Sequence, residues 1–321
     1  MAKVAIEDLS GHTTPVTGNP YDGLISATNN NSKQLQERYD LHRRTRNEQQ
    51  KAKIVDENFP GWVLDEYLVK LDGPRRDPSF VDPRNCLVFW ARPPQKVRNL
   101  VNVIQQKLQD VAPGLWLMPL DNLHMTAMEV THSLTIDEID HLVSILLPNV
   151  HAILDLPCHH RARLIKPMVS YDSAALALSF VPASGEAVPE DRRASEDEYT
   201  YHHLRRDLYT AIENAGVKVA SRYVVPSAHL TIARFNTPNV FAGDPMDKTP
   251  TLELTKRSRW IREIEMINDW LEAEYWPQPG RDIMPGGEWI VGEERGIDFR
   301  KGRLWYGGGE TVKLGTSFAH R

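Results

Sequence analysis

From about residue 85 onward, apolar residues form short continuous runs that alternate with stretches of helical spacing. Residues 85–91 are continuously apolar, which is typical of a buried central strand. Residues 97–108 carry apolar side chains at helical spacing and end before Pro113-Gly114. The same criteria predict the elements that follow in chain order: strand 123–130, helix 136–146, strands 150–154, 161–169 and 174–181, helix 201–212, strands 217–225 and 227–235, helix 261–271, and strands 289–291, 297–306 and 311–314.

The first 83 residues follow a different pattern. Residues 1–30 contain Gly, Pro, Asn and Thr without periodicity, which predicts an extended arm. Residues 32–58 are polar helix formers around the basic run Arg43-Arg44-Thr45-Arg46. This helix is either a solvated surface helix, which its thin apolar stripe favours, or a helix that binds RNA. A connector rich in Pro, Asp and Arg over 73–84 leads into the main fold.

Two His-x-Thr motifs lie in apolar surroundings that predict strands. Side chains of a strand alternate between its faces, so His124 shares a face with Thr126, and His229 shares one with Thr231. The motif alone is weak evidence, because His12-Thr13-Thr14 is a third match in a stretch that is typical of coil. The context of the two strand motifs therefore has to carry the argument.

That context is an internal repeat. Two segments, 84–157 and 158–315, share one order of elements: strand, helix, strand, His-x-Thr strand, helix, strand. The motifs also lie equally far beyond the preceding predicted helix ends, at Asp110 and Ala215. The motif occurs at the equivalent position of both repeats. This coincidence is less probable by accident than two matches to the motif alone. We therefore expect a two-lobed domain over 84–321, with residues 1–83 as an N-terminal extension.

The bulk composition fits a globular protein inside the cell. The chain has 321 residues, of which 41% are hydrophobic and 25% charged. We find neither an apolar run long enough for a membrane span nor a signal pattern. Two cysteines give no disulfide framework, which favours a reducing, cytoplasmic or nuclear compartment. The net charge of −5 argues against tracking of long nucleic acid, so a nucleotide or a strand end is the more natural ligand.

A metal site is not expected. Cys158-His159-His160, with His151 upstream, offers ligands at one end of a loop only, whereas structural zinc sites pair ligands at both ends. No Asp, Glu or His cluster with ligand spacing accompanies the His-x-Thr motifs. We therefore expect neither a metal nor another cofactor.

The paired motifs resemble the 2H phosphoesterase superfamily, whose signature is two H-x-[ST] motifs. Its members include 2′-5′ RNA ligase-like proteins and cyclic nucleotide phosphodiesterases. The resemblance covers about residues 84–315 and includes the first strand, Leu87-Val88-Phe89-Trp90-Ala91. The run Arg303–Gly309 is similar to fungal members. The resemblance to the superfamily implies an α+β fold in which two pseudo-symmetric β-α lobes with antiparallel sheets flank a central cleft.

The residues of the motifs suit phosphodiester chemistry. Histidine has an unperturbed pKa near 6.5, so two imidazoles can act as general base and general acid in one in-line step. Thr126 and Thr231 can donate hydrogen bonds to the non-bridging phosphate oxygens. The resemblance favours His229 as base and His124 as acid, although the sequence itself does not decide between them.

Aromatic residues near the motifs are candidates for substrate binding. Tyr306, Trp305, Phe89 and Trp90 lie on strands expected to border the cleft, where a ring can stack on a nucleobase. For Phe89 and Trp90, a place in the core is the favoured alternative. Arg234 lies an odd number of residues after Thr231, so strict alternation predicts that it faces away, at the surface.

We therefore expect a metal-independent phosphodiesterase that hydrolyses a cyclic phosphate or a 2′-5′ or 3′-5′ linkage of a nucleotide or RNA end. Two alternatives stay open: a non-catalytic nucleotide-binding module, and an RNA-processing adaptor that docks through its N-terminal helix. The residues do not decide between hydrolysis and ligation, or between a 2′-phosphate and a 3′-phosphate product. They also do not identify the physiological substrate. Specificity is expected in loops such as 185–198. The oligomeric state is left open.

Overall fold

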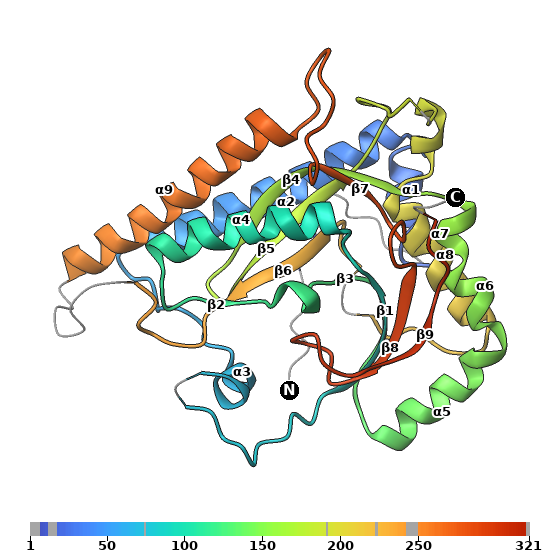
Figure 1. The fold of residues 1–321 in the computed structure, drawn as a ribbon, viewed down its shortest axis with the longest axis horizontal. Coiled ribbons are helices and arrows are strands. Elements are labelled where there is room, and N and C mark those ends of the chain that lie inside the picture. The colour runs from blue at the N-terminus through green and yellow to red at the C-terminus, as the bar shows by residue number, and fades with distance from the viewer. Residues whose placement is uncertain are drawn as a thin grey trace.

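The computed structural model describes residues 7–11, 18–73, 75–190, 192–221, 224–241 and 250–318. It is a mixed α+β structure with two antiparallel sheets and helices packed around them (Figure 1). The third His-x-Thr match, at 12–14, lies outside the described residues.

The smaller sheet has four strands in the order β3-β1-β8-β9. All its pairings are antiparallel. Its strands are β1 (Asn85–Ala91), β3 (Met125–Leu134), β8 (Ile297–Gly302) and β9 (Glu310–Leu314).

The larger sheet has five strands in the order β2-β6-β5-β4-β7, also antiparallel. Its strands are β2 (Trp116–Leu117), β4 (Arg163–Tyr171), β5 (Ala175–Pro182), β6 (Ala228–Arg234) and β7 (Glu288–Ile290). Both predicted lobes supply strands to both sheets, because β2 pairs with β6 and β8 pairs with β1. A boundary near residue 157 therefore does not separate the sheets.

Two long helices, α4 and α9, pack against the larger sheet, and shorter helices pack against the smaller one (Figure 1). The long helices are α4 (Gln95–Val111) and α9 (Pro250–Tyr275). The shorter elements are η1 (Leu120–Asn122), α5 (Ile136–Leu146), η2 (Leu147–Asn149), α6 (Val150–Leu154), α7 (Leu156–His159), η3 (Ala194–Glu198) and α8 (Tyr201–Asn214). Thr135 and Glu138 form the capping box at the start of α5.

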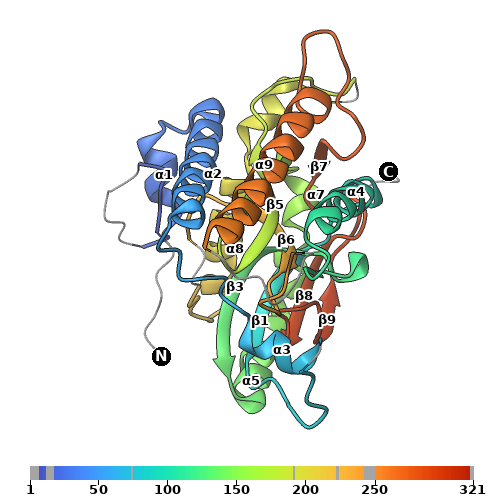
Figure 2. The ribbon, with the colours of Figure 1, turned by 90° about the vertical axis from the view of Figure 1, so that its left-hand side faces the viewer.

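The N-terminal extension contains α1 (Asp22–Ala27), α2 (Ser32–Val55) and α3 (Glu66–Leu71). Helix α2 is the predicted polar helix, and it lies beside α9 (Figure 2). Lys51 forms an ion pair with Glu265, and Arg257 donates to the carbonyl of Ile54 at 2.7 Å. Polar contacts to the main fold thus compensate for the thin apolar stripe of α2. The extended arm expected over 1–30 is wrong at 22–27, which are helical.

Strand β1 divides its side chains between two clusters, as alternation requires. Leu87, Phe89 and Ala91 belong to the main hydrophobic core. Cys86, Val88 and Trp90 face the other way and pack with Leu304 in a smaller cluster. This second face of β1 looks toward the larger sheet, and the candidate site lies there.

Three predicted strands differ in the structure. Residues 150–154 form helix α6, because Val150, Ile153 and Leu154 are buried at helical spacing. The described residues of 217–225 form no strand. Strand β8 ends at Gly302, whose φ of +106° starts a turn, so 303–306 are not extended.

The stretch Ile136–His159 is apolar enough by composition for a membrane span, contrary to our interpretation of the sequence. In the structure it is divided among α5, η2, α6 and α7, with Pro148 and Pro157 at the breaks. The composition of this stretch is therefore only weak evidence of a membrane-spanning helix.

Candidate active site

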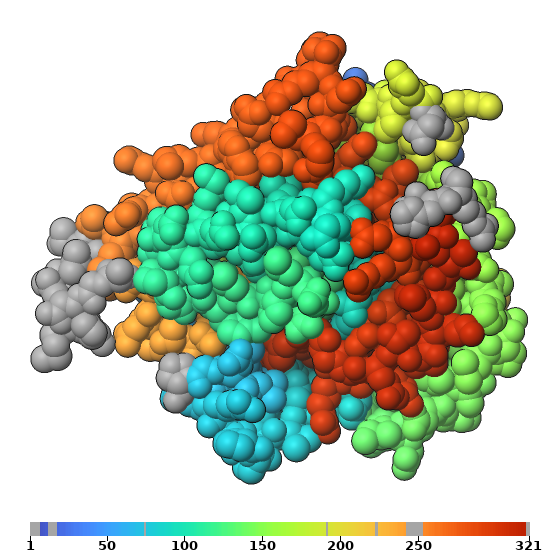
Figure 3. All heavy atoms as spheres, in the orientation of Figure 1, coloured from blue at the N-terminus to red at the C-terminus, as the bar shows by residue number. Residues whose placement is uncertain are grey.

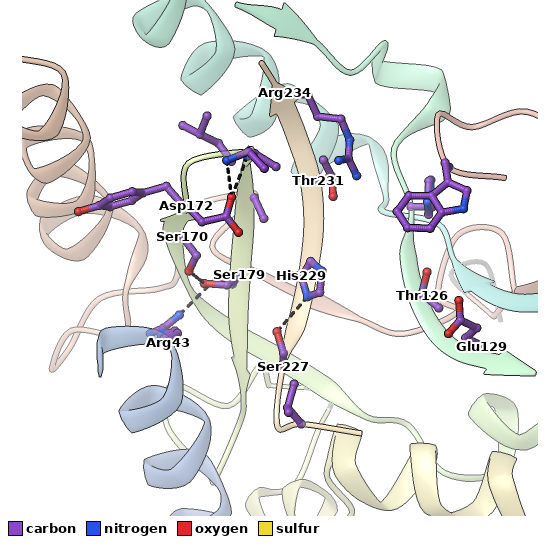
Figure 4. Close-up of a pocket in the computed structure, with 18 of the residues that line it drawn as sticks. Arg43, Thr126, Glu129, Ser170, Asp172, Ser179, Ser227, His229, Thr231 and Arg234 are labelled. Atoms are coloured by element: carbon purple, nitrogen blue, oxygen red, sulfur yellow. Dashed lines mark hydrogen bonds between the residues drawn. The ribbon is translucent and has the colours of Figure 1, made fainter. Parts of the chain in front are cut away.

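A cavity of about 350 Å³ lies between the two sheets and is lined by both His-x-Thr motifs. Strands β1 and β3 form one wall, β5 and β6 the opposite wall, and α2 closes one end. Figure 4 shows His229, Thr231 and Arg234 along β6, with Thr126 and Glu129 across from them and Arg43 of α2 on the far side. The volume is in the range of small-molecule sites. The predicted convergence of the four motif residues on one cavity is thus present in the structure.

His124 precedes β3 and is held on both sides. Its Nδ1 lies 2.8 Å from the carbonyl oxygen of Asn122, and because a carbonyl only accepts, Nδ1 carries a proton. Its ring stacks on Trp90, with 3.8 Å between centroids and 17° between planes. Asn122 also donates from its side chain to the carbonyl of Tyr306 at 3.0 Å. The loop after β8 therefore helps to fix the residue that orients His124.

His229 and Thr231 share one face of β6, as alternation predicts. The Nδ1 of His229 lies 2.9 Å from the hydroxyl oxygen of Ser227, and either group can be the donor. Ser227 is the residue just before β6, two positions before the histidine. Its hydroxyl orients the ring without fixing which nitrogen carries the proton.

A β-bulge follows the threonine of the second motif. Thr231 lies opposite Ala177, and Ala233 lies opposite the residue that precedes Ala177 in the antiparallel strand β5, so Ile232 is an extra residue. The bulge returns Arg234 to the cavity face, where it lines the cavity. The expectation that Arg234 faces away from Thr231 is therefore wrong.

Strand β3 has the same irregularity. Thr126 lies opposite Trp90, and Met128 lies opposite the residue that precedes Trp90 in the antiparallel strand β1, so Ala127 is the extra residue. Glu129 is thereby turned into the cavity, and only 4% of it is exposed. Sequence reasoning missed Glu129, although its offset from Thr126 matches that of Arg234 in the other motif.

Arg234 carries donors that the surrounding side chains do not use. Its Nη1 lies 3.3 Å from a carboxylate oxygen of Asp65, and its side chain is 15% exposed. Its Nε is buried without a hydrogen-bond partner among the described residues. A buried guanidinium N–H facing a cavity is satisfied best by an anionic ligand.

Burial and nearby cations favour the neutral form of both imidazoles. Burial lowers the pKa of His124 to about 3, opposed by the hydrogen bond to Asn122 and reinforced by the charge of Arg92. Burial lowers the pKa of His229 to about 4, reinforced by the charges of Arg46 and Arg205. The cavity therefore has a positive field that favours an anion.

The predicted aromatic residues divide into three groups. Trp90 and Trp305 line the cavity, but the face of Trp90 is taken by His124, so it supports the imidazole. Tyr306 lies outside the lining and donates its hydroxyl hydrogen to Asp65. Phe89 is completely buried and stacks on Phe299 in the main core. The expectation that Phe89 borders the cleft is corrected, because it alternates to the face opposite Trp90.

The loop that carries Trp305 is anchored to the N-terminal extension. The Arg84 guanidinium lies between Tyr67 and Trp305, 3.8 Å and 4.5 Å from their ring centroids, and donates to the hydroxyl of Tyr306 at 3.1 Å. Figure 3 shows the segment around α3 against the C-terminal segment on the molecular surface. The extension thus supports one edge of the cavity as well as closing its end.

Basic side chains of α2 and α8 that line the cavity were also missed as site residues. Arg43, Arg46 and His42 come from α2, and Arg205 comes from α8. The basic run of α2 is visible in the sequence, but its contacts with β4 and β5 are long-range. Among the described residues, no group of three or more His, Cys, Asp or Glu side chains is arranged to hold a metal ion.

Comparisons with known proteins leave the family open. No protein-family profile matches the chain. No curated protein matches it either. Among solved structures it is similar to a conserved protein of unknown function from Agrobacterium tumefaciens str. C58, at 13% identity and a TM-score of 0.43, over 78% of this chain and 99% of that one.

Proposed function

We propose that this protein is a phosphodiesterase of the 2H type that hydrolyses a cyclic phosphate or a phosphodiester of a nucleotide or RNA end without a metal. The observation that carries the proposal is the convergence of two His-Thr pairs, from two different sheets, on one cavity. Two proton-transfer groups on either side of one phosphate meet the basic requirement of in-line hydrolysis.

In this proposal His229 is the general base and His124 the general acid. His229 takes a proton from a water molecule as the water oxygen attacks phosphorus. His124 delivers a proton to the ribose oxygen as the bond between that oxygen and phosphorus breaks. Once a phosphate is bound and raises its pKa, two contacts favour the protonated form of His124. The Asn122 carbonyl accepts from Nδ1, and the Trp90 face stabilises a cation stacked on it. His229 has a hydroxyl partner in place of a carbonyl.

The remaining cavity groups stabilise the charge that develops on phosphate. Thr126 and Thr231 donate their hydroxyl hydrogens to non-bridging oxygens. Arg234 follows Thr231 across the bulge and donates its Nε–H to the phosphate. Its positive charge neutralises the negative charge of the phosphate oxygens on the β6 side of the cavity. These groups and the two imidazoles cover proton transfer and charge stabilisation, so the scheme needs no Lewis acid.

We also propose that the two motif strands belong to pseudo-symmetric halves of a 2H fold. The support is the matched local geometry: in each half, a bulge follows the threonine and turns the third residue beyond it into the cavity. An oppositely charged residue occupies that position in each half, so the halves have diverged in what they contribute.

Turnover of 2′,3′-cyclic nucleotides in the presence of EDTA tests the proposal. We expect conversion to a nucleoside monophosphate, with loss of at least about 100-fold in kcat for His124→Ala and for His229→Ala while both variants stay folded. Wild-type rates in either variant would refute the acid–base scheme. Tight nucleotide binding with no turnover would indicate a non-catalytic binding module.

A further inference from the structure

The end of the cavity that α2 closes is basic and lies apart from the His-Thr pairs. His42, Arg43 and Arg46 line it, and they come from the N-terminal extension. Asp172 is the acid on this side of the cavity. Besides burial, the charge of Arg46 lowers the pKa of His229, so this end acts electrostatically on the reaction centre.

Arg43 fixes α2 against the larger sheet. Its Nη1 donates to the carbonyl of Lys166 at 2.6 Å and to that of Ser179 at 3.3 Å, and its Nε donates to Asp40 at 2.8 Å. These contacts leave Arg43 4% exposed. The basic end of the cavity is therefore held in place by buried hydrogen bonds.

Arg46 is the more exposed of the two arginines of α2 that line the cavity, and it has donors available to a ligand. Its Nη2 donates to Asp172 at 2.6 Å, and its side chain is 34% exposed. A guanidinium has five N–H donors, so one contact leaves most of them for a ligand. Asp172 is itself fixed, because its other oxygen accepts from the backbone N–H groups of Ala174 and Ala175.

The spacing between the two ends fits one small ligand. Ser179 pairs with His229 and Ala177 pairs with Thr231, so β5 lies directly beside the reactive residues of β6. Helix α2 packs against both β5 and β4, so its wall lies one to two strand spacings from β6, about 5–10 Å at a spacing of about 4.8 Å. The small side chains of Ala175 and Ala177 form the floor between the ends.

We propose that Arg46 and the α2 wall form a second anion subsite, which binds a further phosphate group of the substrate while the His-Thr pairs act on the first. This inference rests on the proposed function and narrows its substrate class. The second phosphate is either a 5′-phosphate on the reacting nucleotide or the preceding diester of an RNA strand, and the same guanidinium chemistry recognises both.

Kinetics with three substrates test the subsite: adenosine 2′,3′-cyclic phosphate, its 5′-phosphorylated form, and the dinucleotide ApA ending in a 2′,3′-cyclic phosphate. We expect the wild type to prefer one or both phosphate-bearing substrates by at least about tenfold in kcat/KM. Arg46→Gln should bring that ratio near one, mainly through KM. The matched control is Arg44→Gln, two positions away on α2, whose side chain pairs with Asp40 outside the cavity.

The preferred substrate identifies the source of the second phosphate. No preference for either, or an equal loss on all three substrates in Arg46→Gln, would overturn the subsite. Loss of the preference in Arg44→Gln would also overturn it, because helix placement would then be the cause.

Binding without turnover separates the subsite from the proposed function. Adenosine 2′,5′-bisphosphate and adenosine 2′-monophosphate can be titrated against the tryptophan fluorescence of wild type and Arg46→Gln. A bisphosphate preference that needs Arg46, in a protein that turns over no cyclic phosphate, would keep the subsite and refute the phosphodiesterase. Turnover of a cyclic phosphate, together with equal affinity for the bisphosphate and the monophosphate, would keep the phosphodiesterase and refute the subsite.

Discussion

Glu129 and Arg234 occupy the same position in the two motif strands, each being the third residue beyond the threonine of a His-x-Thr and turned into the cavity by a bulge. One is an acid and the other a base, so the walls of the cavity are electrostatically unlike. An anion is drawn toward Arg234, whereas hydroxyl or amine groups of a ligand suit the carboxylate of Glu129. We therefore expect the pair to give an anionic ligand one preferred orientation.

Removing the guanidinium of Arg234 should impair catalysis strongly. Arg234→Gln loses the charge and the buried Nε–H beside Thr231, for which we expect a drop of about 100-fold in kcat/KM for a 2′,3′-cyclic nucleotide. Arg281→Gln is the control, because that exposed arginine pairs with Glu274 and neither residue lines the cavity. Less than about a twofold change in Arg234→Gln would show that Arg234 does not contact the phosphate.

Binding of phosphate should be coupled to proton uptake. Burial lowers the pKa of His124 to about 3 and that of His229 to about 4, so both rings are neutral at pH 7. An anion between them favours the imidazolium and raises these values, so the complex takes up protons. Titration calorimetry of adenosine 2′-monophosphate at pH 8, in buffers of different ionisation enthalpy, should show up to about one proton taken up per ligand.

The histidine variants separate this uptake from protonation of the ligand itself. His124→Asn should lose most of it, since His124 is the proposed acid. Equal uptake by the wild type, His124→Asn and His229→Asn would show that neither imidazole is the proton acceptor.

The stack of Trp90 on His124 should be visible in the pH dependence of kcat. An indole face stabilises the imidazolium, so Trp90→Leu should shift the basic limb of the profile to lower pH, by up to about one unit. Because Trp90 is buried, the melting temperature must show that the variant is folded under the assay conditions. An unchanged basic limb, whatever the change in absolute rate, would contradict the role of the stack.

The sequence was informative where one simple period governs the structure. Alternation placed His229 and Thr231 on one face, and helical spacing located α4, α8 and α9. It failed at Arg234 because the inserted Ile232 resets the alternation, and a bulge has no compositional signal there. It also failed at Phe89, because the period alone does not say which face of β1 meets the cavity.

The contribution of α2 to the cavity could not be predicted from the sequence, for a different reason. A row of arginines on a helix is usually solvated, and Arg44 in fact is. Arg43 is buried only because carbonyls of β4 and β5, more than 100 residues later, accept from it. The spacing of residues 150–154 was compatible with either a strand or a helix, and the packing of Val150, Ile153 and Leu154 decided for helix α6.

A double-mutant comparison on one cyclic nucleotide tests most directly whether the two His-Thr pairs act on a single phosphate. Groups that act as a unit in one step have non-additive effects on kcat. We predict that His124→Ala, His229→Ala and the double variant lose kcat to the same level within about tenfold, in EDTA and with all three proteins folded. Near wild-type kcat in either single variant, or losses that multiply in the double variant, would contradict a shared acid–base site.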